Sequence, residues 1–143
     1  MPIYKRKNVS PVYFPALDEE HLEISKVVEE LRLAVAKGAG APAGLVQAAV
    51  ERLAEHAAAH FAYEERMMRA SRYYGYAWHL QSHNAARKRV RLAAERAEAG
   101  DASGVSEIVE FCKGWLRDHT GLHDRMMSAF LRGYQREGGR LPS

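Results

Sequence analysis

The chain has little of several features that mark particular classes of protein. A single cysteine, Cys112, among 143 residues excludes an internal disulfide and agrees with a reducing compartment. No run of about 18 apolar residues is present, so the sequence offers no membrane-spanning helix. The polar beginning also lacks the apolar core of a signal peptide. We therefore expect a cytoplasmic protein that does not act in a membrane.

Alternation of apolar and polar residues with a period of two is also missing, so the sequence predicts no sheet. The formal net charge is only +3 and comes largely from a basic cluster, Arg87, Lys88, Arg89 and Arg91. Because no aromatic residues interleave with this cluster, we interpret it as a solvated helix face and expect no nucleic-acid partner. A hydrophobic fraction of 47% is ordinary for one globular domain, and the expected fold class is all-α.

Prolines and glycines divide the chain into an extended N-terminal segment and four helical segments. Asp18 is the expected N-cap of the first helix, and Pro42 is the expected start of the second. Either Asp101 or Ser103 is expected to open the last helix. The expected divisions are an arm over residues 1–16, a helical bundle over residues 17–137 and a C-terminal tail over residues 138–143.

Each helical segment carries an apolar stripe with steps of three and four residues, and a polar interruption lies within every stripe. The interruptions are His21, His60 with Glu64, His79 with His83, and His119 with Asp124. A lone histidine on such a stripe is usually a hydrogen-bonded core residue, and a glutamate usually reaches out to solvent. Four interrupted stripes together, however, would leave many buried polar groups without partners unless a metal compensates.

The kinds of side chain in these interruptions narrow the choice of metal. Imidazole nitrogen with carboxylate oxygen and no thiolate suits iron, manganese or zinc. Seven potential ligands are too many for one tetrahedral zinc ion. The residues therefore predict a paired-metal site, for which two iron ions fit best.

The last pair of candidate ligands has an unusual spacing. His119 and Asp124 are five residues apart, which on a regular α-helix turns the two side chains about 140° away from each other. We expect a local π-helical widening near Gly121, which would bring both onto one face. In the alternative register, His123 replaces Asp124 as the ligand. Spacing slightly favours His123, whereas the need for a second bridging carboxylate favours Asp124.

Taken together, the motifs resemble those of the hemerythrins, especially the small single-domain members of bacteria. The resemblance covers roughly residues 12–134 and implies an up-down-up-down four-helix bundle that holds two irons. The matching motifs are Asp18-x-x-His21, His60-Phe61-x-x-Glu64-Glu65, His79-x-x-x-His83 and Trp115-Leu116-x-x-His119-x-x-x-x-Asp124.

The resemblance also implies how the irons are held and what they do. One iron would be bound by His79, His83 and His119 and the other by His21 and His60, with Glu64, Asp124 and an oxo or hydroxo group bridging the two. The second iron would keep an open position, at which family members bind dioxygen reversibly. The implied function is carriage, storage, delivery or sensing of dioxygen, without catalysis. Reduction of peroxide or nitric oxide at the same iron, or iron storage or sensing, are the alternatives.

Five further side chains resemble the lining of the family's ligand pocket by their offsets from the ligands. They are Ile24, Phe61, Trp115, Leu116 and Thr120. Ordinary core packing is the alternative for each apolar one. Thr120 departs from the isoleucine common in the family. Its hydroxyl could contact bound ligand or admit water and shorten the life of the oxygenated form, or it could bond back to a backbone carbonyl. We interpret His56 and His123 as neighbours of the site or surface residues, outside the ligand set.

Overall fold

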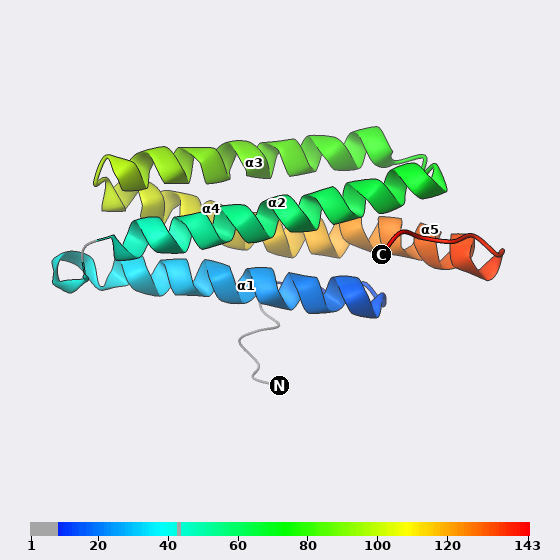
Figure 1. Cartoon of the computed structure of the whole chain (residues 1–143), viewed down its shortest axis with the longest axis horizontal. Helices are drawn as coiled ribbons and strands as arrows, with labels where there is room; N and C mark the ends of the chain where they lie inside the picture. Colours follow the sequence, from blue (N-terminus) through cyan, green and yellow to red (C-terminus); the bar gives the residue numbers. More distant parts are fainter. Residues whose placement is uncertain (1–8, 43) are drawn as a thin grey trace.

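The computed structural model describes residues 9–42 and 44–143. These residues form four helical rods that run alternately in opposite directions (Figure 1). No strand occurs within the described ranges, so the all-α expectation is confirmed. The rods are α1 (Pro15–Ala36), α2 (Leu45–Ser71), α3 (Tyr76–Glu98) and a fourth made of α4 (Ala102–His119), η3 (Thr120–Asp124) and α5 (Arg125–Arg136). A short 3₁₀ turn, η2 (Gly38–Gly40), follows α1.

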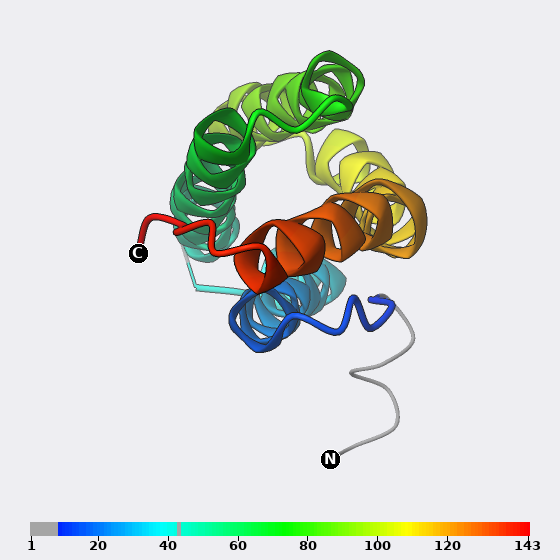
Figure 2. The same ribbon diagram turned by 90° about the vertical axis from the view of Figure 1, so that its right-hand side faces the viewer.

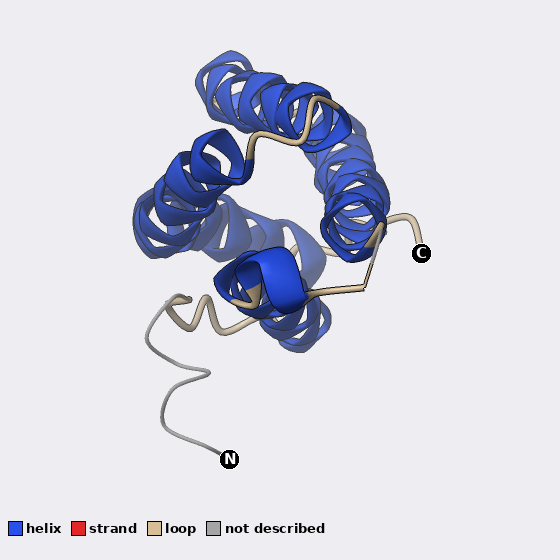
Figure 3. Ribbon diagram, turned by 90° about the vertical axis from the view of Figure 1, so that its left-hand side faces the viewer, coloured by secondary structure: helices blue, strands red, loops and turns tan. Residues whose placement is uncertain are grey.

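The rods close into a ring, as the two end-on views show (Figures 2 and 3). Each rod packs against the next one along the chain, and α4 packs back against α1. The expected four-helix bundle is therefore confirmed. Throughout the part of the chain that the structure describes, no helix has the length and apolar character needed to span a membrane.

Apolar side chains form two main core clusters with a polar layer between them. Leu31, Leu53 and Ile108 belong to the larger cluster, and Leu17 and Met67 belong to the smaller one. In every rod the candidate ligands lie between residues of these two clusters. Burial of apolar surface on both sides therefore fixes the polar layer in the interior of the bundle.

The start of the first helix differs from the expectation. Pro15 lies in the first turn of α1 and not in the arm, because a first-turn residue needs no N–H and proline already has a helical φ. The residue that precedes the helix is Phe14, in extended conformation with φ −133°. The expected N-cap role of Asp18 is therefore wrong, since Asp18 lies inside the first turn. Residues 1–8 of the expected arm lie outside the described residues.

Of the two later helix starts, one differs from the expectation and one agrees with it. Pro42 does not begin the second helix, because α2 starts at Leu45 after Gly44, whose φ is +79°. Asp101 does cap α4, and its Oδ1 accepts a hydrogen bond from the Gly104 N–H at 2.9 Å. One of the two expected caps of the last rod is thus confirmed.

The described part of the arm packs on its own bundle, over η3 and α5. Val12 is fully buried, and its N–H donates to Asp18 Oδ1 at 2.8 Å. The Ser10 N–H donates to Thr120 Oγ1 at 2.9 Å. Arg132 Nη1 donates to the Val12 carbonyl at 2.7 Å. Asp18 therefore holds the arm in place, and it does so from within the helix.

Replacing Asp18 with alanine removes the acceptor of the Val12 N–H. We expect Asp18→Ala to lower the free energy of unfolding by about 1 to 3 kcal/mol, as loss of a hydrogen bond to a charged group does. Urea unfolding followed by circular dichroism measures this. Glu19→Ala, at the exposed neighbouring position, is the control and should stay within about 0.5 kcal/mol of wild type. Equal destabilisation by both substitutions would contradict the role given to Asp18.

Candidate metal centre

Seven side chains from the four rods converge in the polar layer, and none is more than 5% exposed. Their potential ligand atoms form two groups, and within each group all these atoms lie within 4.8 Å of one another. One group has three histidines, His79, His83 and His119, and the other has two, His21 and His60. Both groups include Glu64 and Asp124. The structure thus brings together every residue in the ligand set expected from the sequence.

A π-helical turn brings the fourth rod's two candidate ligands together. Residues Thr120–Asp124 form this turn, the segment η3, and the expected widening near Gly121 is confirmed. Because the turn takes up one extra residue, Nε2 of His119 and Oδ1 of Asp124 lie 2.9 Å apart. His123, the ligand of the alternative register, belongs to neither group.

The two carboxylates each divide their oxygens between the two groups. Glu64 Oε1 lies 2.9 Å from His83 Nε2, whereas Glu64 Oε2 lies 3.0 Å from His60 Nε2. Asp124 Oδ1 lies 2.9 Å from His119 Nε2, whereas Asp124 Oδ2 lies 3.0 Å from His21 Nε2. Each carboxylate therefore places one oxygen beside each of the two groups of imidazoles.

Three of the imidazoles are oriented by a polar side chain on the preceding rod. In each case Nδ1 hydrogen-bonds outward, which leaves the lone pair of Nε2 directed into the cluster. The pairs are His60 with Glu20 at 2.6 Å, His83 with Glu65 at 2.7 Å, and His119 with Ser82 at 2.7 Å. The sequence reasoning missed these roles. The available signal was position, since each partner adjoins a candidate ligand in sequence and points about 100° away from it on the helix.

The partner of His83 also changes the interpretation of the basic cluster. Glu65 Oε2 lies 2.8 Å from Arg87 Nη2 and 2.7 Å from His83 Nδ1. The carboxylate of Glu65 thus links the first arginine of the basic cluster to a candidate ligand. Arg89 lies over the ring of Phe111, with 4.6 Å between the guanidinium carbon and the ring centroid. The expectation that this cluster is only a solvated helix face is therefore wrong for Arg87, whereas Arg89 is exposed as expected.

Without a metal, protons on the imidazoles balance the negative charge of the buried carboxylates. Burial by itself lowers the pKa of His21, but the neighbouring carboxylates of Asp124 and Glu64 outweigh it and raise the pKa to about 9. Nearby carboxylates outweigh burial in the same way at His79, whose pKa rises to about 9, and at His60, whose pKa rises to about 10. Burial raises the pKa of both carboxyl groups, yet the surrounding imidazoles hold these pKa values below the usual range. The protonated imidazoles thus supply the positive charge that a bound cation would supply.

The geometry of the cluster fits metal ions better than hydrogen bonds. His119 Nε2 and both oxygens of Asp124 are buried without a hydrogen-bond partner, although His119 Nε2 and Asp124 Oδ1 are only 2.9 Å apart. Nitrogen and oxygen atoms that converge in this way suit a shared cation, which would take the place of the protons on the imidazoles. The donors are nitrogen and oxygen without sulfur, which suits iron, manganese or zinc. The cluster is therefore a metal-binding site in its chemistry.

The aromatic residues of the expected pocket lie against imidazoles of the three-histidine group. Phe61 stacks on His83 with 4.3 Å between ring centroids, and Trp115 stacks on His119 at 4.3 Å. Leu116 is buried in the larger core cluster. These contacts support the imidazoles by packing, and they leave the assignment of a ligand pocket a prediction.

Thr120 is fully buried, and its hydroxyl is occupied by backbone groups. It donates to the Leu116 carbonyl at 2.8 Å and accepts from the Ser10 N–H at 2.9 Å. Of the roles that the sequence left open, these contacts favour the backbone one. The hydroxyl links the arm to the π-helical turn.

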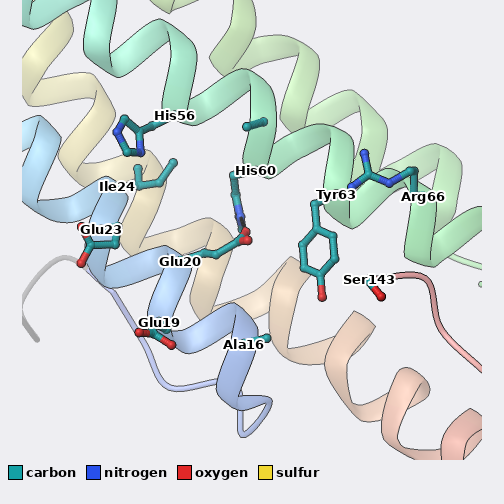
Figure 4. A pocket seen from close by; sticks show the side chains of 11 residues that line it. Ala16, Glu19, Glu20, Glu23, Ile24, His56, His60, Tyr63, Arg66 and Ser143 are labelled. Carbon is teal, nitrogen blue, oxygen red and sulfur yellow. Dashed lines mark hydrogen bonds and ion pairs between the residues drawn. The ribbon is translucent and has the colours of Figure 1, made fainter.

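A groove of about 690 Å³ lies between α1 and α2, beside the two-histidine group (Figure 4). Ile24 and His60 form part of its wall, and the carboxylate of Glu20 reaches the His60 ring (Figure 4). His56 and Tyr63 also line it, and His56 belongs to neither group of potential ligands. Of the candidate ligands, only His60 lines the groove, and its side chain is 5% exposed there.

Comparison with known proteins adds one finding to the geometry. A family model described as Hemerythrin HHE cation binding domain matches residues 13–131, a range that contains all seven side chains of the cluster. No curated protein and no solved structure matches the chain.

The metal-free protein should lose stability as the pH rises from neutrality. The raised pKa values of His21 and His79 contribute stability below about pH 6.5, the unfolded value, and this stability is lost as the pH passes through about 9. We therefore expect the free energy of unfolding of metal-free protein to fall by several kcal/mol between pH 7 and pH 10, as measured by urea unfolding.

Zinc-loaded protein is the control for this experiment, because a metal replaces the protons on the imidazoles. Its unfolding free energy should change less over the same range of pH. Identical pH profiles with and without zinc would contradict the imidazolium network.

Proposed function

The chain belongs to the hemerythrin HHE cation-binding family, and on that premise we propose that it binds dioxygen reversibly at a pair of iron ions. The resemblance drawn from the sequence motifs is confirmed by this membership. The observation that carries the proposal is the division of the Glu64 and Asp124 oxygens between two groups of histidines. The two irons would supply the two electrons that dioxygen takes up when it binds.

The two groups of ligands offer unequal numbers of donors. Three imidazoles and two carboxylates surround one position, and two imidazoles with the same carboxylates surround the other. We assign the open coordination position to the group that contains His21 and His60, which offers one imidazole fewer. The groove beside Ile24 and His60 supports this assignment, because His60 of that group lines it.

Reversible binding also needs a site from which water and stray protons are kept away. Phe61 and Leu116 are buried, and Ile24, which lines the groove, is only 7% exposed. We propose that these apolar side chains, with Trp115, form the dry wall of the ligand pocket. Glu20 and Ser82 would hold their imidazoles in place, so that a ligand can enter and leave without rearrangement of the rods.

Reduction and admission of air test the proposed function directly. Protein loaded with iron and reduced without oxygen should contain two irons per chain, develop a visible absorption band in air and lose it under vacuum. Asp124→Ala removes one bridging carboxylate and should lower both the iron content and the band. A band that never reverses, with turnover of peroxide or nitric oxide, would favour an enzyme instead. Labile iron without any band would favour storage or sensing of iron.

Thr120→Val removes the hydroxyl that is engaged by Leu116 and Ser10. We expect the autoxidation rate of the oxygenated protein to stay unchanged, because the hydroxyl is turned to the backbone. The free energy of unfolding should fall by about 1 kcal/mol, as the Ser10 N–H loses its acceptor. Spectrophotometric decay of the oxygenated form and urea unfolding measure the two effects. Slower autoxidation in the variant would show that the hydroxyl reaches the pocket.

A further inference from the structure

Four aromatic rings form a nearly parallel stack that leads from the surface to the cluster. In order from the surface they are Trp78, His123, His119 and Trp115. The centroids of neighbouring rings are 3.9, 4.9 and 4.3 Å apart, and their planes are inclined by 20°, 14° and 13°. Trp78 comes from α3, and the other three lie four residues apart along α4 and η3. We call this set the ring column.

The outer half of the ring column has no part in the candidate ligand set. His123 belongs to neither group of potential ligands, and its Nδ1 is buried without a hydrogen-bond partner. Its ring is held instead between Trp78 on one face and His119 on the other. Trp78 is 38% exposed, so its indole is accessible to a partner molecule, whereas Trp115 at the other end of the column is partly buried.

The role that we infer for the column rests on the proposed function, because buried irons that become oxidised need a route for electrons. Reversible release of dioxygen returns both electrons to the irons, but oxygen that leaves as peroxide would leave two Fe³⁺, which must be reduced before the protein can bind dioxygen again. The candidate ligands are buried, however, and His119 is only 3% exposed. Electron tunnelling weakens steeply across gaps between atoms, and rings in van der Waals contact shorten those gaps. An electron that reaches Trp78 therefore has a nearly continuous path of π systems to a metal ligand.

We propose that Trp78 and His123 form the path by which electrons enter the metal centre through His119. The donor is a one-electron reductant, such as a reduced flavin, that contacts the exposed edge of the indole. Each of two donor molecules is oxidised by one electron, and the two electrons convert two Fe³⁺ to two Fe²⁺. The rings provide orbital overlap only and keep all their bonds and protons.

The position of the column separates this path from the groove. The column lies where α3 meets η3 of the fourth rod, whereas the groove lies between α1 and α2. In a ring in which each rod packs on the next, these two junctions are opposite each other (Figure 2). A donor on Trp78 therefore does not block the route by which dioxygen would arrive.

Stopped-flow reduction of the diferric protein by reduced methyl viologen, without oxygen, tests the path. Trp78→Leu and His123→Leu each remove one ring, and we expect the reduction rate to fall several-fold in both. Trp78→Phe restores a ring at the surface end and should recover most of the rate. Tyr74→Leu, which removes an exposed aromatic side chain from the turn before α3, is the matched control and should leave the rate unchanged.

Two further measurements separate a path from a structural role. The midpoint potential and the azide affinity of the diferric protein should be the same in wild type and in every variant. An unchanged reduction rate in Trp78→Leu and His123→Leu would overturn the proposal. A lower rate that always accompanies a shifted potential or azide affinity would also overturn it, because the rings would then tune the metals instead of carrying electrons. Iron content and the reversible band in air, measured on the same samples, report separately on the proposed function.

Discussion

The structure depends on one electrostatic constraint, which is that Glu64 and Asp124 are completely buried between two apolar core clusters. An unpaired carboxylate in such surroundings costs several kcal/mol, so positive charge must lie beside each one. The five imidazoles surround the carboxylates from all four rods, as protonated partners or as co-ligands of a metal. The bundle packs around this charge balance, and the rods cannot slide or rotate without breaking it.

Helix periodicity was enough to predict the rods and the residues that converge in the polar layer, because each ligand takes a core position on its own stripe. The π-helical turn was also within reach, since His119 and Asp124 are both needed inside yet are five residues apart. Asp18 was placed wrongly because its hydrogen bond depends on the arm folding back over α1, which no local signal in the sequence reports. Local sequence patterns therefore predict which residues of a single helix face the core.

Contacts between rods are a different matter, because they depend on how neighbouring rods are rotated. Glu20, Glu65 and Ser82 each adjoin a ligand on one rod and orient an imidazole on the next. Trp78 likewise completes the ring column from another rod, so the distance in sequence between Trp78 and His123 does not indicate that their rings stack. These residues look like ordinary polar or surface positions in the sequence. Only the packed bundle gives them a function.

The chain of support between rods has a consequence for how the site forms. Glu20 on α1 orients a ligand of α2, Glu65 on α2 orients one of α3, and Ser82 on α3 orients one of α4. His21 on α1 and His79 on α3 have no such partner for their Nδ1 atoms. The orientation of His60, His83 and His119 therefore depends on the docking of the rod before each of them. A metal ion then replaces protons in a site that packing has already shaped, so that metal binding and folding stability are coupled through the same seven side chains.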